Sequence, residues 1–567
     1  MPLPLPPAIT IIKTERIFPS EPLTSPRAVP LSLLDATTAE FALTSCVWLF
    51  NPPSVPYNIQ NFQDLASHLK HSLSETLISY PQWCGTCKPS AGASPNSTAR
   101  HHTDRFGRIH VYFGLPSDPG VGYVTAVSPT CLEDLHPANR TDWTPIWSNN
   151  KQHGDWGSLP DLSAFSPQTT VSSPLNPNDK RQPLLAIQLT SLSCGGLILG
   201  IKAAHPMADI ASLVHFVKTW GAISRGGLDR IPTPSLLPGL PIFDPSALDA
   251  CAAGDINADQ PDLTIVKKAK ELLMHRYDWW HPDSIKGCPW PTSGVPDGFN
   301  FEDEKETMNK PVPWGEWDVS CAVERCVIHF TAKEIEMLWE NAKMNSEVEV
   351  SKHDALVAHI WFCITRGRNF KPSDSELLHC NLVIGARRAL GLPDHFQGSP
   401  IVMVNTALPA SLVCQSEERH KVAQEIRATI SRVNNKEALS NHLHGLAFEK
   451  SPQRIWQAFL GLKHVLVTSW VRSGIYEVDF GFGGGIRYAE AIVPALDGQV
   501  VIKEGPPPVA SIGLRDQDTV DGDAKGQESW TKYGVDVLVN LDAASLRAFV
   551  MDPLLKPHTR LVNQVGS

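Results

Sequence analysis

The stretch "GGLILGIKAAHPMADIASLVHF", residues 195–216, carries the strongest signal in this chain. Its first half is an apolar run that leads to His205 and is typical of a buried strand. Asp209 stands four residues later, and the next apolar side chains recur at the helical spacing i, i+3, i+4, i+7. These side chains are Ile210, Leu213, Val214 and Val217. The stretch therefore predicts a strand, a turn that presents His205, and a helix that "SRGG" at 224–227 ends.

A histidine on a turn between a strand and a helix is well placed to act as a general base. Pro206 stiffens this turn, because its ring fixes φ and removes a backbone donor. A neutral imidazole, with an ordinary pKa of about 6.5, can take a hydroxyl proton near neutral pH. With 21 histidines, roughly one H-x-x-x-D pair is expected by chance, and His205 with Asp209 is the only one in the chain. The position of this motif between a predicted strand and a predicted helix favours a functional role.

Asp209 has two interpretations. Its carboxylate could hold the imidazole in orientation and so belong to the catalytic group. It could instead cap the helix that starts at Ile210, or pair with a nearby arginine, and so support the loop only. The sequence favours the supporting role and leaves both open.

Composition excludes several classes of protein. The chain has 567 residues, 42% of them hydrophobic, which predicts two large domains and allows a third. Only 19% of residues are charged, the net charge is −10, and no Lys/Arg-rich run is present, so a nucleic-acid partner is not expected. The prolines in "MPLPLPPAITIIKTERIF" break any secretory signal, and no apolar run reaches the roughly 18 residues of a membrane span. We expect a cytoplasmic protein without a membrane span.

One cysteine pair resembles a chemical motif. "CGTC" places Cys84 and Cys87 at the spacing of a redox pair or of half a zinc site. No second C-x-x-C accompanies it, so we favour two buried apolar thiols. No metal site is predicted anywhere in the chain.

Apolar periodicity predicts an α/β protein with mixed sheets and helices outside them. Strands are expected within 30–50 and 183–204, the latter as a pair around a glycine turn, and at 107–114, 324–330 and 534–541. Helices are expected at 61–80, 262–274, 331–343 and 351–368. Residues 115–182 are rich in Pro, Ser, Asn and Asp and are expected to be mostly loops.

The segment 228–322 differs from its surroundings because it is rich in proline and tryptophan. Five tryptophans fall in it: Trp279, Trp280, Trp290, Trp314 and Trp317. A connection this long is either a lid or crossover, or a tether anchored by packed tryptophans. Both interpretations stay open.

A second motif lies far downstream, in "YEVDFGFGGGIRYAE" at 476–490. Its glycines fail the G-x-G-x-x-G spacing of a dinucleotide site, and no helix pattern follows. They indicate a tight turn or a close backbone approach around Gly481, Phe482 and Gly483. Asp479, at the end of the preceding strand, requires a partner if it is buried.

Together, "HPMAD" and "DFGFG" resemble the motifs of the BAHD acyltransferase family in order and separation. The resemblance extends over nearly the whole chain, through "PLSLLD", "CGGLILGIKAAHPMAD", "SKHDALVAHIWFCITRGR", "VIGARRALGLP" followed by "FQGS", and "YGVDVLVNL". The proline-rich stretches and the extra length resemble the fungal secondary-metabolite branch, which includes trichothecene O-acetyltransferase-like proteins. The resemblance implies two chloramphenicol-acetyltransferase-like domains, here 1–227 and 323–567, joined by the crossover 228–322.

The resemblance also implies roles for single residues. His205 would deprotonate the acceptor, whose oxygen attacks the thioester of an acyl-CoA, acetyl-CoA first of all, without an acyl-enzyme. Asp209 would be the motif aspartate. Asp479 would lie away from the chemistry and bind an arginine, which by position is Arg387, with Arg388 as the second choice. The acceptor would be a hydroxyl of a small secondary metabolite, and the enzyme would work as a monomer.

The chain departs from the family pattern at three positions. Ala204 stands where a second histidine is common, Ile210 replaces the usual glycine, and Phe482 replaces the tryptophan of DFGWG. None of these changes removes a proton-transfer group, so an active enzyme is expected.

Two other functions remain open. A condensation-type transferase uses a similar histidine motif, but it takes its substrate from a carrier protein, and no carrier segment is evident before Ser567. A catalytically degenerate protein could bind a metabolite or a partner through the tryptophan-rich segment.

Overall fold

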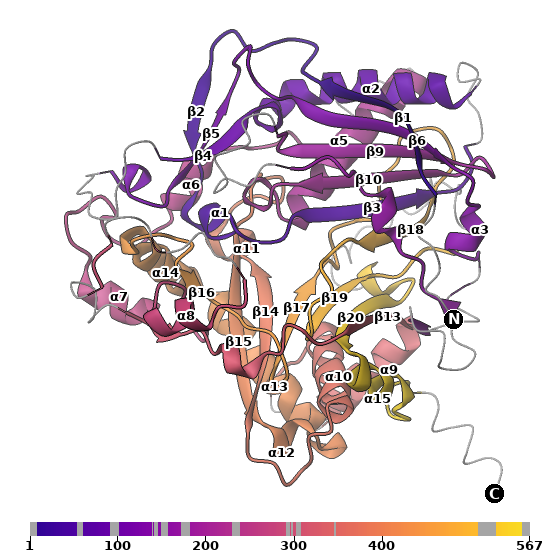
Figure 1. The fold of residues 1–567 in the computed structure, drawn as a ribbon. Helices are drawn as coiled ribbons and strands as arrows, with labels where there is room; N and C mark the ends of the chain where they lie inside the picture. The colour runs from indigo at the N-terminus through magenta and orange to yellow at the C-terminus, as the bar shows by residue number, and fades with distance from the viewer. Residues whose placement is uncertain are drawn as a thin grey trace, which may run out of the picture.

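The structure of the protein is a computed structural model. It describes residues 8–53, 61–90, 101–138, 140, 146–148, 157–171, 182–229, 239–290, 295, 299–301, 308–344, 348–508 and 529–557. Two large sheets with helices on their outer sides form the molecule (Figure 1). The predicted mixed α/β architecture is confirmed.

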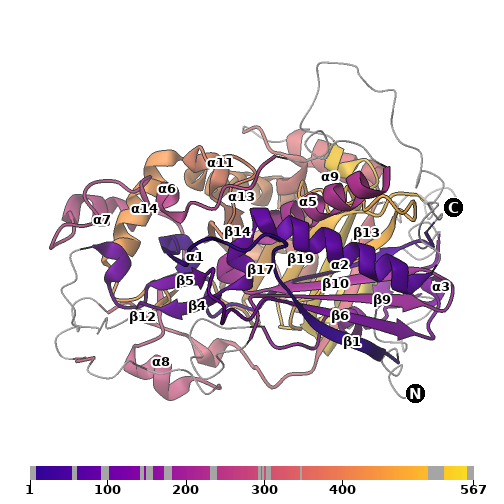
Figure 2. The same ribbon diagram turned by 90° about the horizontal axis from the view of Figure 1, so that it is seen from above.

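The first large sheet has six strands in the order β1-β6-β9-β10-β3-β18. They are β1 (Thr10–Ile17), β6 (Val121–Ser128), β9 (Leu185–Leu192), β10 (Leu197–Ala203), β3 (Thr44–Phe50) and β18 (Ile486–Ala491). The expected strand pair β9–β10 turns at Gly195, whose φ of 82° is open to glycine at little cost. Helices α2 (Phe62–Ser79) and α5 (Ile210–Asp229) cover one face of this sheet (Figure 2). Asn61 caps α2 by accepting from two backbone N–H groups.

The second large sheet has eight strands in the order β15-β14-β17-β19-β20-β13-β7-β8. They are β15 (Ile401–Pro409), β14 (Leu377–Gly385), β17 (His464–Ser469), β19 (Gln499–Glu504), β20 (Val535–Asp542), β13 (Val323–Phe330), β7 (Ile146–Ser148) and β8 (Gly157–Ser158). Its covering helices are α9 (Ala332–Met344), α10 (Lys352–Gly367), α13 (Arg419–Val433) and α15 (Ala543–Met551). Ser351 and Asp354 form a capping box at the start of α10, a helix that is buried almost all round.

The two large sheets exchange strands. Strand β18 comes from the second half of the chain and pairs with β3 in the first sheet. Strands β7 and β8 come from the first half and extend the second sheet beside β13. One hydrophobic core holds the two together, since Val327, Val501 and Leu538 of the second sheet cluster with the core of the first.

Two three-stranded sheets and several short helices complete the described fold. One small sheet joins β2 (Arg27–Pro30), β5 (Ile109–Phe113) and β4 (Thr86–Pro89), and the other joins β12 (Lys310–Pro311), β11 (Tyr277–Asp278) and β16 (Ile455–Trp456). The remaining helices are α1 (Leu33–Thr37), α3 (Leu132–Leu135), α6 (Pro245–Asp249), α7 (Leu263–Ala269), α8 (Pro282–Gly287), α11 (Arg387–Leu390), α12 (Ala410–Val413) and α14 (Lys436–Phe448).

The described part of the crossover is a packed layer. Trp279 stacks on Trp456 with ring centroids 5.1 Å apart, and Trp317 meets Phe459 edge-on at 5.7 Å. Asp278, fully buried, pairs with Arg454 at 2.7 Å. These contacts match the tether interpretation for the residues concerned; 230–238, 291–294, 296–298 and 302–307 lie outside the described residues.

One expectation was incomplete and another was wrong in detail. The loop-rich region 115–182 contains the eight-residue strand β6, which "VGYVTAVS" forms although prolines and serines surround it. Helix α5 continues through "SRGG" to Asp229, because tertiary packing outweighs the helix-breaking tendency of the two glycines. Among the described residues, no helix combines the length and the apolar character needed to cross a bilayer.

Candidate active site

His205 lies at the end of β10, in the one-turn 3-10 helix His205–Met207 that links this strand to α5. Its Nδ1 is 2.9 Å from the hydroxyl oxygen of Ser399, and the ring of Phe41 meets it edge-on at 5.6 Å. Its Nε2 bonds to no protein group among the described residues. The side chain is half-buried, and burial lowers the pKa of His205 below its ordinary value, so the imidazole is neutral near pH 7.

Ser399 is held in turn by the buried carboxylate of Asp35. The Ser399 N–H donates to Asp35 Oδ1 at 2.5 Å, and Ser32 donates its hydroxyl to Asp35 Oδ2 at 2.7 Å. Burial raises the pKa of Asp35 to about 7. Sequence reasoning assigned no role to Asp35 or Ser399, although both stand in stretches that carry the family resemblance, "PLSLLD" and "FQGS".

Asp209 does not contact the imidazole through a hydrogen bond. Its Oδ1 accepts the Ser212 N–H at 2.9 Å, in the manner of a helix cap, and both of its oxygens accept from Arg387, at 2.5 and 3.0 Å. The two side chains are only 9% and 8% exposed. The supporting interpretation of Asp209 fits this geometry and the catalytic one does not, because Ser399 takes the place beside His205 that an orienting carboxylate would occupy.

Arg387 clamps the loop 396–399 to the start of α5. It donates to the carbonyl oxygens of Phe396 and Gly398 at 2.9 and 3.2 Å and to the Ser212 hydroxyl at 2.8 Å. Gly398 has φ 138°, and a Cβ at this position would lie 2.8 Å from Asp35 Oδ1. Only glycine therefore lets this loop approach Asp35 closely enough to place Ser399 against His205.

The partner expected for Asp479 was wrong. Asp479 pairs with Arg225 of α5 at 2.7 Å, while Arg387 is bound to Asp209 and Arg388 is exposed. The Asp479 side chain is 49% exposed and also accepts the Gly481 N–H at 2.8 Å. The physical reason is burial: the guanidinium of Arg387 is enclosed and requires an equally enclosed carboxylate.

The rest of the glycine-rich loop is a tight turn, as expected. Gly481 and Gly483 have φ values of 84° and 78°, in the left-handed region. Phe482 is buried and packs against Phe50 with ring centroids 5.5 Å apart. The loop thus packs against α5 and β3 of the first sheet.

The cysteines of "CGTC" are buried apolar thiols. Cys84 and Cys87 are both free, and burial raises the pKa of Cys84 to about 12. Cys87 contacts the sulfur of Met207 at 3.5 Å. A thiol held protonated in this way is a poor nucleophile and a poor metal ligand.

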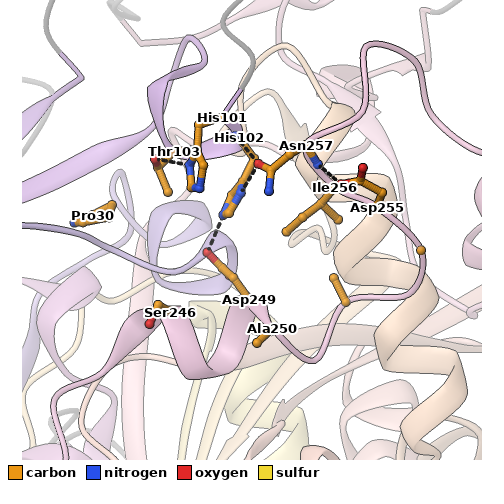
Figure 3. Close-up of a pocket in the computed structure, with 12 residues that line it drawn as sticks. Pro30, His101, His102, Thr103, Ser246, Asp249, Ala250, Asp255, Ile256 and Asn257 are labelled. Atoms are coloured by element: carbon orange, nitrogen blue, oxygen red, sulfur yellow. Dashed lines mark hydrogen bonds and ion pairs between the residues drawn. The ribbon is translucent and has the colours of Figure 1, made fainter.

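A cavity of about 480 Å³ is lined by residues of the turn 101–103, of α6 and of the segment that follows α6 (Figure 3). In its wall, His102 Nε2 bonds to Asp249 Oδ2 at 3.1 Å, and His102 Nδ1 bonds to Asn257 at 3.0 Å. Asp249 Oδ1 accepts the Leu33 N–H at 2.9 Å, so the cavity wall and the Asp35–Ser399–His205 chain share α1. His205 itself does not line this cavity.

The fold is that of a two-lobed α/β protein with a histidine on the turn between a strand and a helix. The chain belongs to the Transferase family, that of the BAHD acyltransferases: the family profile matches residues 7–94, 153–237 and 316–509. The resemblance seen in the motifs is confirmed, and the protein is an acyltransferase of this family.

Individual relatives agree with this assignment. Acyltransferase AFT15-1 of Alternaria alternata is 26% identical over 85% of this chain and 87% of its own length. Acyltransferase abl6 of Leptosphaeria maculans is 22% identical over 96% and 98%. Among solved structures, vinorine synthase superposes with a TM-score of 0.56 at 17% identity, covering 95% of this chain and 96% of its own. F. sporotrichioides TRI101, complexed with coenzyme A and T-2, gives a TM-score of 0.56 at 16% identity, covering 93% of this chain and 97% of its own.

Proposed function

We propose that the protein transfers an acyl group, acetyl first of all, from an acyl-CoA to a hydroxyl of a small secondary metabolite, with His205 as the general base. The observation that carries this proposal is the state of the His205 ring. Its Nδ1 is fixed by Ser399, its Nε2 has no protein partner among the described residues, and burial favours the neutral form. A base in this state has one lone pair ready for an incoming proton.

The chemistry follows from this arrangement. With Nδ1–H donating to Ser399 Oγ, Nε2 accepts the acceptor's hydroxyl proton while the oxygen attacks the thioester carbonyl carbon. The tetrahedral intermediate collapses to the ester and expels the coenzyme A thiolate, which recovers the proton from the imidazolium. The chain Asp35–Ser399–His205 holds the ring throughout, and no acyl-enzyme forms.

The relatives support the donor and the class of acceptor. TRI101 has been crystallised with coenzyme A together with T-2, and two fungal acyltransferases match most of this chain. Asp209 is proposed as a positioning residue, which keeps α5 and the Ser399 loop in register. The monomeric state and the cytoplasmic location remain predictions.

The test is a donor screen with a matched histidine control. Free-thiol release from acetyl-CoA and longer acyl-CoAs is measured with hydroxylated metabolites present, and products are identified by mass. His205→Ala should lower turnover by about 10² to 10⁴, whereas His71→Ala, on the exposed side of α2, should leave it unchanged. Near-normal turnover by a folded His205→Ala protein contradicts the mechanism.

The same screen separates the two alternative functions. Transfer from a carrier-bound thioester but not from free acyl-CoA supports a condensation-type enzyme. The absence of product from every donor supports a binding protein.

The pH profile gives a second test. Because burial lowers the pKa of His205, the base stays unprotonated to a lower pH than a free histidine. The acidic limb of kcat/KM should therefore fall below the ordinary histidine pKa of 6.5. The contrary result is an acidic limb above pH 6.5 in the wild type that is missing from the residual activity of His205→Ala. This result would show that the imidazole is not the desolvated base proposed.

A further inference from the structure

Three histidines from three separate segments converge outside the site described above. His275 precedes β11 in the crossover, His379 lies in β14 and His464 begins β17. His379 and His464 face each other across the parallel β14–β17 pair, with stacked rings 4.5 Å apart. His275 lies 4.9 Å from the first ring and 5.2 Å from the second. One ring nitrogen of each residue lies within 4.8 Å of the others.

The ring nitrogens in this cluster are short of partners. His464 is 1% exposed, and neither of its nitrogens has a hydrogen bond to a described protein group; His275 Nε2 is likewise buried without one. Buried polar atoms of this kind normally have a partner, so each requires an explanation. His379 differs, because its Nδ1 is 3.2 Å from the amide oxygen of Asn405, which leaves Nε2 available.

The surroundings of the cluster are aromatic, and its main chain is fixed by hydrogen bonds. Phe459 meets the His464 ring edge-on, and Tyr277 stacks on His275 at 4.7 Å. The main chain of each histidine is anchored by a hydrogen bond, to Gln457 O, Lys463 O and Gly461 O respectively.

We propose that His275, His379 and His464 form a binding site for a divalent transition-metal ion of the zinc class. Three imidazoles are a frequent ligand set for Zn²⁺, at Zn–N distances of about 2.0–2.1 Å. A tetrahedral ion at those distances requires nitrogens about 3.3 Å apart. A modest rotation of the side chains would bring the three ring nitrogens to this separation. The Asn405 amide would orient His379 from the outer side, as second-shell groups do. Glu316, whose carboxylate is 3.6 Å from His464 Nε2, could supply a fourth ligand or an outer hydrogen bond.

The role of such an ion would be to fasten the crossover to the second sheet. His275 belongs to the crossover, whereas His379 and His464 belong to the sheet. Metal binding would therefore stabilise the folded chain, since the ligand set is assembled only on folding. The proposal is independent of acyl transfer, because no member of the set contacts His205 through any hydrogen bond or ring contact in the described structure.

The experiment uses the full chain without an affinity tag, stripped with EDTA and dialysed. ZnCl₂ is titrated by calorimetry, CoCl₂ is added to record the visible absorption of a tetrahedral Co²⁺ site, and the melting temperature is measured with and without Zn²⁺. His275→Ala and His379→Ala each remove one half-buried ligand, and His71→Ala is the matched control. We expect one Zn²⁺ per chain, a higher melting temperature, and a loss of affinity of at least about 100-fold in either ligand variant, since even outer-shell changes cost 10–100-fold.

Several results would overturn the proposal. One is the absence of stoichiometric Zn²⁺ binding by the wild type. Another is binding that His275→Ala and His379→Ala retain, which would place the ion elsewhere, for example at a cysteine. If one variant does not fold by circular dichroism, the other decides the matter. A Co²⁺ spectrum of octahedral type, unchanged between the wild type and the variants, also counts against the site.

Discussion

Helix α5 is held at each end by an aspartate–arginine pair, and the two pairs differ in burial and in the segment that each joins to the helix. At its start, Asp209 binds Arg387 with both side chains less than a tenth exposed. Near its end, Arg225 binds Asp479 with side chains 22% and 49% exposed. Each charge has the sign that favours its end of the helix dipole. The buried pair joins α5 to the loop that carries Ser399, whereas the exposed pair joins it to the glycine-rich turn.

The difference shows that a motif residue's importance depends on its surroundings. Two charges removed from water are costly, and each becomes indispensable to the other once both are enclosed. An exposed pair gains little, because water and salt screen it. The aspartate of "DFGFG" therefore takes part in the weaker ion pair, and the aspartate of "HPMAD" takes part in the stronger one.

The largest effect on stability is expected from Asp209→Ala. It would leave the Arg387 guanidinium buried without a counter-charge, and breaking such a pair costs about 3–5 kcal/mol in free energy of unfolding. Urea unfolding of Asp209→Ala against Asp479→Ala measures this directly. Equal losses in the two variants would remove the distinction between the pairs.

A smaller loss, on the order of 1.5–3 kcal/mol, is expected from Arg387→Lys. Lysine keeps the charge but lacks the planar fork that reaches both Asp209 oxygens together with the carbonyl oxygens of Phe396 and Gly398. Because the Ser399 loop would loosen, kcat should fall more than KM rises. If Arg387→Lys is as stable and active as the wild type, charge alone holds the loop and the hydrogen-bond geometry is irrelevant.

The smallest effect is expected from the exposed pair. A double-mutant cycle of Arg225→Ala and Asp479→Ala should give a coupling energy of about 0.2–1 kcal/mol that shrinks as salt is added. The measurement is thermal or urea unfolding at low and high ionic strength. A coupling above 2 kcal/mol that salt does not change would mean that the pair behaves as a buried one.

Local features of the fold were predictable, and the contacts that complete the site were not. The strand, turn and helix around His205 follow from spacing alone, as do the caps at Asn61 and Ser351. The support of His205 depends on Ser399 and Asp35, which are 364 positions apart, and no local pattern specifies such a contact. The partner of Asp479 was mistaken for the same reason.

A site made of residues that lie far apart in the chain is not predictable from sequence when their spacing matches no motif. His275, His379 and His464 lie far apart in the chain, and none belongs to a ligand motif with a fixed interval. Only the parallel register of β14 and β17 brings two of them together. Periodicity predicts which residues face a core, and the order of strands in a sheet decides which of those residues meet.

The exchange of β18 affects how the newly made chain reaches its final form. Arg487 on β18 bonds to Asn51 just after β3, 436 positions earlier, so the open edge of β3 stays uncovered while the intervening chain is synthesised. At the usual 5–20 residues per second this wait lasts roughly 20–90 s. During that time an apolar strand edge is available to wrong partners, and cellular chaperones are expected to occupy it. The two halves of the chain, if separately expressed, should therefore aggregate rather than reassemble.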